Sequence, residues 1–245
     1  MKIEYIEICN FKVFQKAEAR DLPDFAVFIG KNGSGKTTFF DIFGFLHDCL
    51  IGNIKSALAK RGGYKEVISR GHEGEDISFI IKFRPSVNEP EITYELSIGL
   101  DENRAAVINN EVMRLRRGEK GAPWIVLKFS RGVGVAAAGE LKRYEDVRLA
   151  QREKQQLEAP DILAIKGLGQ FKEFVAITSL RKLIEDWYVS DFRIDAARER
   201  HESEYSEHLT RKGDNLSVVT KYIHDNYPEL FNDKIFNEMG EKFNL

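Results

Sequence analysis

Cysteine is scarce in this sequence: only two occur among 245 residues, Cys9 and Cys49. Two cysteines exclude a small fold held together by a disulfide framework, and they fit the reducing cytosol. Long hydrophobic runs are missing as well, since no apolar stretch approaches the roughly 18–20 residues that span a bilayer. The first ten residues alternate charged with apolar side chains, unlike a secretory signal. We therefore expect a cytoplasmic protein with no membrane partner.

An excess of charge of one sign is also lacking. The 37 lysines and arginines against 39 aspartates and glutamates leave a net charge of −2. This balance argues against a generally basic nucleic-acid coat protein, although it leaves local patches open. With 42% hydrophobic and 31% charged residues, the composition is that of a globular chain. The length suffices for one large domain or two small ones.

The first 50 residues show a strand–loop–helix pattern. Residues 2–9 are rich in β-branched side chains and predict a strand, and a turn-prone segment follows at 22–24. The short apolar run 26–29 suits a buried parallel strand. After a glycine-rich stretch, apolar residues recur at spacings of three and four, which predicts an amphipathic helix with one apolar face: Phe39, Ile42, Phe43, Leu46 and Leu50.

The glycine-rich stretch carries the sharpest chemical motif. Residues 30–37, GKNGSGKT, match the pattern G-x-x-x-x-G-K-[ST]. Glycines let successive backbone N–H groups point inward around anionic oxygens, and the N-terminus of the following helix adds its dipole. Lys36 would reach the β- and γ-phosphates of a nucleotide, and the Thr37 hydroxyl would complete a Mg²⁺ coordination shell. A chance glycine-rich turn is the alternative, but the expected strand before it and helix after it favour phosphate binding.

The rest of the chain divides into strands and then helices. Short strands are predicted at 77–83, 92–100, 105–108, 112–115 and 124–129, with a tight turn at Asn109-Asn110, and they indicate an antiparallel meander. Residues 140–158 hold five basic and five acidic residues and no glycine or proline, which is typical of a solvated helix. The remaining segments predict helices over 174–187 and 215–226, an extended stretch over 188–194, and a strongly charged stretch over 196–209.

The N-terminal block resembles the ABC-type ATPase heads of the SMC/RecF/OLD superfamily, among predicted bacterial ATPases of the AAA type. Residues 3–12 resemble the opening strand of those heads, which ends in Asn-Phe-Lys; residues 28–37 resemble their phosphate-binding block, and residues 41–46 their following helix. Weaker likenesses lie at 57–71 and 213–223. The resemblance implies an α/β P-loop NTPase, lobe I of an ABC-type head, with an antiparallel β-subdomain and a mainly helical C-terminal part. It also implies that 1–245 is a single, incomplete head, divided into 1–56, 77–131, 140–158 and 171–245.

The resemblance further implies a ligand and its site. ATP with Mg²⁺ would bind at Gly30, Asn32, Gly33, Ser34, Gly35, Lys36, Thr37 and Thr38, with Asn10 and Lys12 near the adenine or the phosphates. Thr37 would hold the metal. Gln170 is a weaker candidate for the glutamine that senses Mg²⁺ and the γ-phosphate, and a polar turn residue is the favoured alternative. In such heads ATP lies between two protomers, so the implied partner is a second copy or the second half of the head.

The carboxylate pair that this class needs for hydrolysis is not found. It would follow a buried strand, where an aspartate orients the Mg²⁺ shell and a glutamate activates water. Glu185-Asp186 has the acids in the wrong order within a helical pattern, and Asp101-Glu102 ends an alternating strand as a turn would. No glycine-containing signature loop and no switch histidine are found either. We therefore expect a chain that binds ATP, stops before the second half of the head, and hydrolyses ATP negligibly alone.

Three function classes remain to be compared. The first is the ATP-binding part of an SMC/RecF/OLD-like ATPase in DNA repair or anti-phage defence, with DNA contact through the basic residues of 112–131 as a further hypothesis. The second is a non-hydrolysing nucleotide switch that regulates a partner nuclease or another effector. The third, a P-loop kinase or GTPase, is disfavoured because no guanine-specific Asn-Lys-x-Asp and no nucleotide-kinase lid pattern occur.

Overall fold

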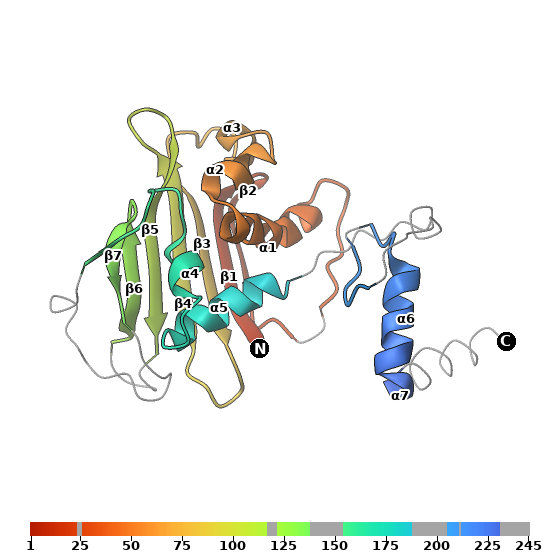
Figure 1. The fold of residues 1–245 in the computed structure, drawn as a ribbon. Coiled ribbons are helices and arrows are strands. Elements are labelled where there is room, and N and C mark those ends of the chain that lie inside the picture. Colours follow the sequence, from red (N-terminus) through yellow and green to blue (C-terminus); the bar gives the residue numbers. More distant parts are fainter. Residues whose placement is uncertain (24–25, 117–121, 138–153, 188–204, 211, 231–245) are drawn as a thin grey trace. The chain divides into compact units, whose positions relative to one another are not determined.

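A computed structural model describes residues 1–23, 26–116, 122–137, 154–187, 205–210 and 212–230. The chain forms two compact units, Met1–Trp187 and Tyr188–Leu245. Residues 174–187, where a helix is predicted, belong to the first unit, whose fold is drawn in Figure 1.

The first unit is built on one eight-stranded sheet, in which every strand pair among the described residues is antiparallel. The spatial order is β2-β1-β3-β4-β5-β6-β7-β8. The predicted meander is therefore confirmed, and it is larger than expected. The strands are β1 (Lys2–Phe11), β2 (Phe14–Arg20), β3 (Ile77–Arg84), β4 (Ile92–Leu100), β5 (Ala106–Leu115), β6 (Trp124–Ser130), β7 (Val133–Ala136) and β8 (Gln155–Gln156).

One face of this sheet is buried in the core. Along β3 and β4, alternate residues are buried and pair across the strands, such as Phe79 with Leu96 and Ile81 with Tyr94. The intervening residues point to the opposite face and include charged side chains such as Lys82 and Glu95. This period of two is the one that the sequence shows, and it fixes which face packs.

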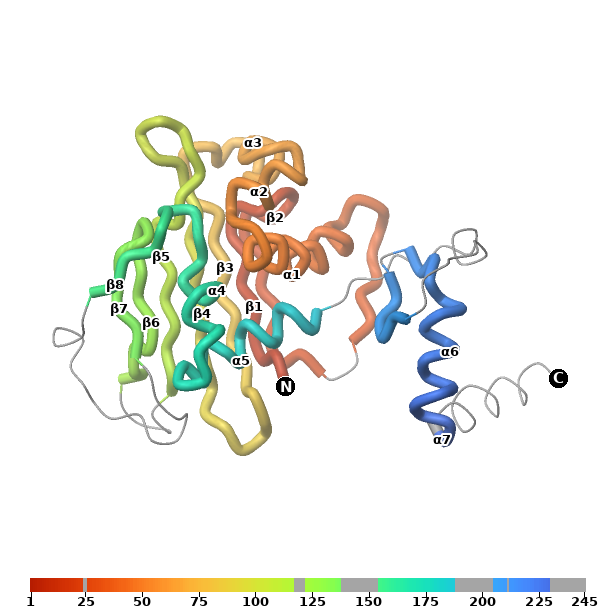
Figure 2. The backbone as a smooth tube through the Cα atoms, viewed as in Figure 1, coloured from red at the N-terminus to blue at the C-terminus, as the bar shows by residue number. Residues whose placement is uncertain are grey.

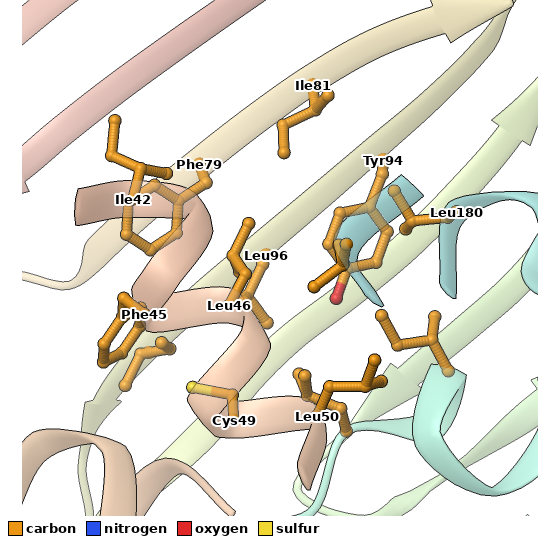
Figure 3. Packing of buried hydrophobic residues seen from close by; sticks show 14 of the residues in the cluster. Ile42, Phe45, Leu46, Cys49, Leu50, Phe79, Ile81, Tyr94, Leu96 and Leu180 are labelled. Atoms are coloured by element: carbon orange, nitrogen blue, oxygen red, sulfur yellow. The ribbon is translucent and has the colours of Figure 1, made fainter. Parts of the chain in front are cut away.

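Helices cover the buried face. They are α1 (Lys36–Ile51), α2 (Ile54–Ala59), α3 (Tyr64–Val67), α4 (Ala164–Leu168) and α5 (Val175–Glu185). Figure 3 shows side chains of α1 pointing at Phe79, Leu96 and Tyr94, with Leu180 of α5 beside them. Each large side chain that is fully buried in this way contributes roughly 1.5–3 kcal/mol. The helices predicted from residue 39 onward and over 174–187 are confirmed.

The buried parallel strand predicted at 26–29 is wrong. The segment pairs with none of the described strands, and Val27 and Ile29 are 68% and 92% exposed. Figure 2 shows it within the long loop between β2 and α1. A parallel strand needs parallel neighbours for its backbone N–H and C=O groups, and the described strands offer only an antiparallel sheet.

Two smaller expectations also fail. The turn predicted at Asn109-Asn110 does not form, because β5 runs through both residues and a register shift at Ser97/Ile98 of β4 absorbs the mismatch. The Asn109 amide lies 3.0 Å from both carboxylate oxygens of Asp76 and is held in the strand. Of the helix predicted over 140–158, residues 140–153 lie outside the described residues, and Gln155–Gln156 form β8.

The second unit contains α6 (Leu216–Asn226) and α7 (Pro228–Leu230), so the helix predicted at 215–226 is confirmed. Asn215 organises the start of α6. Its Oδ1 accepts the Thr210 N–H at 2.8 Å, and its Nδ2 donates to Ser206 Oγ and His208 O. The extended stretch predicted at 188–194 and most of 196–209 lie outside the described residues. None of the helices among the described residues is both long and apolar enough to cross a membrane.

Candidate functional site

The loop at Gly30–Gly35 leads directly into α1 and depends on two glycines. Gly33 and Gly35 have φ values of 83° and 92°, a backbone region that side chains with a Cβ resist. Gly35 is needed for a second reason. A Cβ there would lie 2.6 Å from the ring of Phe14 and 3.1 Å from Val13 Cγ2. The turn between β1 and β2 therefore packs against the N-terminal end of α1.

The N-terminus of α1 is open to an anion. No side chain of the described residues caps it, and its first turn contains no acidic residue. The first intrahelical bond runs from the Phe39 N–H to the Gly35 carbonyl at 2.8 Å. The N–H groups of residues 36–38 therefore have no acceptor within the helix, and the helix dipole adds partial positive charge there. This is the geometry that favours a phosphate group.

Lys36 places its ammonium over the loop. Its Nζ donates to the carbonyl oxygens of Gly30 at 2.7 Å and Lys31 at 2.8 Å. Both are exposed hydrogen bonds between a charged donor and a neutral acceptor. Phosphate oxygens would replace these acceptors with stronger, charge-assisted ones. The Thr37 hydroxyl, one residue on, is the hard oxygen ligand that Mg²⁺ prefers.

A cavity of about 490 Å³ lies beside the first turn of α1. Its lining joins the β1–β2 turn, through Lys12 and Val13, with Thr38 of α1 and with the segment that follows α3. That segment contributes Ser69 and Arg70, and Lys65 of α3 adds a third cation. The cavity is large enough for a small organic ligand, and its lining contains these three cations and one carboxylate, that of Glu66.

Residues 1–244 match the family model of the AAA ATPase domain. The chain belongs to the AAA ATPase domain family. The match supports ATP binding and ATPase chemistry in general, and it is consistent with the resemblance to SMC/RecF/OLD-like ATPases. It also makes the chain a member of a P-loop NTPase family. No curated protein matches this chain.

The loop and α1 bring together most of the site residues predicted for this AAA ATPase domain: Gly30, Asn32, Gly33, Ser34, Gly35, Lys36, Thr37 and Thr38. Asn10 is elsewhere. It is buried in β1, and its amide donates to Glu75 Oε2 at 3.0 Å and to the Asp76 carbonyl at 3.1 Å. Asn10 thus links β1 to the turn before β3, and its contact with a nucleotide stays a prediction.

Lys12 and Gln170 have different surroundings. Lys12 lines the cavity beside α1 and pairs with Asp41 of that helix at 2.5 Å. Gln170 lies in the turn between α4 and α5, where its amide donates to the Lys166 carbonyl at 3.3 Å. This position fits the favoured interpretation of Gln170 as a polar turn residue, and its role in metal binding stays a prediction.

The two carboxylate pairs rejected as catalytic groups have structural partners. Asp101 Oδ1 accepts the backbone N–H groups of Asn103 and Ala105 and closes the turn between β4 and β5. Glu185, at the end of α5, pairs with Arg181 at 2.8 Å. Neither arrangement is that of a carboxylate presented after a buried strand.

The basic residues of 112–131 do not form one run of unpaired charge. Arg114 is paired with Glu95 on the neighbouring strand. Lys128 is exposed on β6, and Arg131 donates to Asn109 Oδ1 at 3.3 Å. Residues 117–121 lie outside the described residues. DNA contact through this region stays a prediction.

The β1–β2 hairpin positions the site, and its second strand is not among the strands predicted from the sequence. Strand β2 begins at Phe14, which packs against Gly35, and Ser69 Oγ donates to the carbonyls of Lys12 and Phe14 at 2.9 and 2.8 Å. The signal was present, because residues 16–20 alternate charged residues with alanine. Such alternation indicates a half-buried strand, but alanine is only weakly hydrophobic, so the pattern of residues 16–20 is faint.

Proposed function

We propose that this chain binds ATP with Mg²⁺ and forms the nucleotide-binding part of an SMC/RecF/OLD-like ATPase head. The observation that carries the proposal is the loop at 30–35 joined to the uncapped N-terminus of α1, with Lys36 held over it. The loop and helix N–H groups would hold the β- and γ-phosphates, Lys36 would neutralise them, and Thr37 would hold Mg²⁺. A bound Mg²⁺ ion would supply positive charge that offsets the charge of the phosphates.

The cavity beside α1 would receive the nucleoside. It begins at Thr38, in the same helical turn as the phosphate ligands, and extends to the β1–β2 turn. Lys12 and Arg70 on its walls would favour the electron-rich edge of the ligand and any phosphate beside it.

The exposed segment 26–29 supports a partner that completes the head. Ala26 and Phe28 of this segment line a second cavity of about 470 Å³ together with Phe39 and Phe40 of α1, while Val27 and Ile29 are exposed. Exposed β-branched residues in a segment that pairs with none of the described strands are a template for an added strand. We propose that the second half of the head, in the same protein or in another chain, pairs there and supplies the catalytic carboxylates. ATP would then be enclosed between protomers. We propose that the assembled ATPase acts in DNA repair or anti-phage defence.

Whether the bound ATP is hydrolysed depends on whether the partner supplies catalytic carboxylates. Asp101 and Glu185 are engaged in structural contacts. This favours a chain that binds the nucleotide but does not cleave it in the absence of a partner. A non-hydrolysing switch that regulates a partner nuclease or another effector is therefore the second candidate. Assembly measured with ATP and with a non-hydrolysable analogue separates the two, because only the ATPase needs turnover to release its partner.

Calorimetry with ATP, ADP and AMP, each with and without Mg²⁺, tests the binding proposal. We expect ATP and ADP to bind more tightly than AMP, because the loop holds the β-phosphate. Equal affinity for all three, with no effect of Mg²⁺, would exclude the site at 30–38. Size-exclusion chromatography of the chain mixed with the second half of the head tests the partner, and Val27→Asp and Ile29→Asp should lower their ATP-dependent association without lowering the melting temperature of the chain. The matched control is Val87→Asp, at a position 88% exposed in the turn between β3 and β4.

A further inference from the structure

Asp41, on the second turn of α1, is bound by two cations at once. Lys12 Nζ lies 2.5 Å from Asp41 Oδ2. Arg61, which follows α2, donates through Nη2 to Oδ1 at 2.9 Å and through Nε to Oδ2 at 3.1 Å. One carboxylate therefore carries a two-point arginine contact and a separate lysine contact. Arg61 alone would satisfy both of its oxygens.

Arg61 is fixed in place by other contacts. Its Nη1 donates to Asp48 Oδ2 at 2.7 Å and to the Ala57 carbonyl at 3.0 Å. Its guanidinium lies 5.3 Å from the centroid of the Phe45 ring, and its side chain is only 11% exposed. A planar, permanently charged group with this many partners is a static anchor for α1.

The backbone of Lys12 is held by hydrogen bonds, whereas its side-chain ammonium has fewer contacts. Its φ is 52°, an unfavourable value for a lysine. The conformation is maintained by the Lys12 N–H, which donates to the Val67 carbonyl at 2.6 Å, and by Ser69 Oγ, which donates to the Lys12 carbonyl at 2.9 Å. The ammonium donates to one carboxylate, that of Asp41, and the side chain is 30% exposed. Lys12 also lines the cavity that begins at Thr38.

The charges show which partner can leave. Burial alone would raise the pKa of Asp41, but hydrogen bonds from Arg61 and Lys12 outweigh it and hold the pKa below its ordinary value. If Lys12 leaves, Arg61 keeps the carboxylate paired and hydrogen-bonded. If Arg61 leaves, Asp48 also loses a partner. The lysine is thus the exchangeable member of the cluster.

We infer that Lys12 exchanges partners when a polyphosphate binds at 30–38. Without the ligand, the Lys12 ammonium is paired with the Asp41 carboxylate. When the ligand binds, the ammonium moves to a phosphate oxygen and Arg61 alone stays paired with Asp41. This inference rests on the proposed ATP binding. It makes Asp41 a positioning residue that lowers nucleotide affinity by competing for Lys12. The exchange moves no proton and breaks no covalent bond. It replaces one charge-assisted contact with another.

Asp41→Asn tests the inference, because it removes the competing charge and keeps the shape. We expect ATP to bind about three- to tenfold more tightly to Asp41→Asn than to the wild-type chain, a range set by one partly exposed ion pair. Asp48→Asn is the matched control. It removes the other acidic partner of Arg61 on the same helix, and we expect ATP affinity to stay within about twofold. In Lys12→Met, adding Asp41→Asn should bring no gain, because the competing cation is already gone.

The outcomes are separable. If the wild-type chain binds ATP and Lys36→Met abolishes binding, but Asp41→Asn leaves affinity unchanged or weaker, the exchange is refuted and the ATP site stands. If the wild-type chain does not bind ATP at all, the proposed function itself fails. Lys12→Met keeps the inference testable should Asp41→Asn not fold. It should weaken ATP binding while changing the melting temperature by no more than about 2 °C. A large loss of melting temperature with unchanged ATP affinity would make Lys12 purely structural and refute the exchange.

Discussion

The carboxylate of Glu111, on β5, accepts the backbone N–H of Ala164 at 2.6 Å and so joins the centre of the sheet to the first turn of α4. The same carboxylate accepts the Ile165 N–H at 3.1 Å and the Tyr94 hydroxyl at 3.1 Å. Glu111 is completely buried. An ionisable group with this burial and these partners makes the stability of the first unit depend on pH.

The stability of the wild-type chain should fall from mildly acidic to neutral pH because of Glu111. Burial raises the pKa of its carboxyl group from 4.5 to about 7, and the three hydrogen bonds only partly oppose this. The folded state then binds the proton more tightly than the unfolded state, so stability is fully present below pH 4.5 and is lost as pH rises towards 7. The loss is on the order of 3 kcal/mol.

Glu111→Gln checks this dependence by thermal unfolding between about pH 5 and 8. The amide stays neutral and can still accept from the α4 backbone, so the melting temperature of the variant should change less with pH than that of the wild-type chain. Parallel curves for the two proteins across this range would show that Glu111 does not titrate there.

Lys166 should stabilise the C-terminal end of α1. Its Nζ donates to the carbonyls of Ile51 at 2.9 Å and of the C-cap residue Gly52 at 2.5 Å, and the last turn of α1 itself contains no basic residue. Lys166→Met should lower the free energy of unfolding by about 1 kcal/mol, measured by urea denaturation. Lys172→Met, at an exposed position in the turn after α4, is the control and should change it by no more than about 0.5 kcal/mol. Equal effects of the two would deny Lys166 this role.

Sequence predicted the parts of the fold that local pattern decides. The unbroken alternation of 92–100 became β4, and the spacing of apolar residues from Phe39 became the buried face of α1. The glycine loop at 30–35 could be recognised directly because its chemistry is local. What failed depends on distant partners. Residues 26–29 look like a buried strand, yet no neighbour pairs with them in the described sheet, and Asn109 stays in β5 because it contacts Asp76.

The pair formed by Asp41 and Arg61 could not be predicted for the same reason. Twenty residues separate them, and nothing in either local pattern shows that the segment after α2 folds back onto α1. The cavity beside α1 likewise joins stretches of chain that are distant in the sequence. Such sites follow from tertiary packing, while single motifs follow from the sequence alone.

Gly33 and Gly35 should differ in their tolerance of alanine. Gly33→Ala adds strain alone, because no atom of the described residues lies within 4 Å of the new Cβ, and should cost about 1 kcal/mol. Gly35→Ala adds overlap with the Phe14 ring and should cost roughly 1–3 kcal/mol more. Adding Phe14→Leu should recover part of the Gly35→Ala loss in urea denaturation. No recovery would indicate that the β1–β2 turn does not pack on the loop.

DNA binding, if it occurs through 112–131, should depend on Lys128 and Arg131. Each alanine substitution should weaken binding and reduce the slope of log affinity against log salt by about 0.9 for each DNA phosphate that is no longer neutralised. The measurement is fluorescence anisotropy with labelled duplex and single-stranded DNA over a range of salt. Lys172→Ala serves as the matched control. An unchanged affinity and salt slope in both variants would remove this region as a DNA contact.

Titration calorimetry with ATP and Mg²⁺ on the wild-type chain, Lys36→Met and Lys31→Met tests ATP binding at the loop most directly. Lys31 lies in the loop and Lys36 is the first residue of α1, and the Lys36 ammonium donates to the Gly30 and Lys31 carbonyls. We predict that Lys36→Met abolishes measurable binding while the folded state is retained, and that Lys31→Met binds within about threefold of the wild-type chain. Wild-type affinity in Lys36→Met, or no binding by the wild-type chain, would contradict a nucleotide site at this loop.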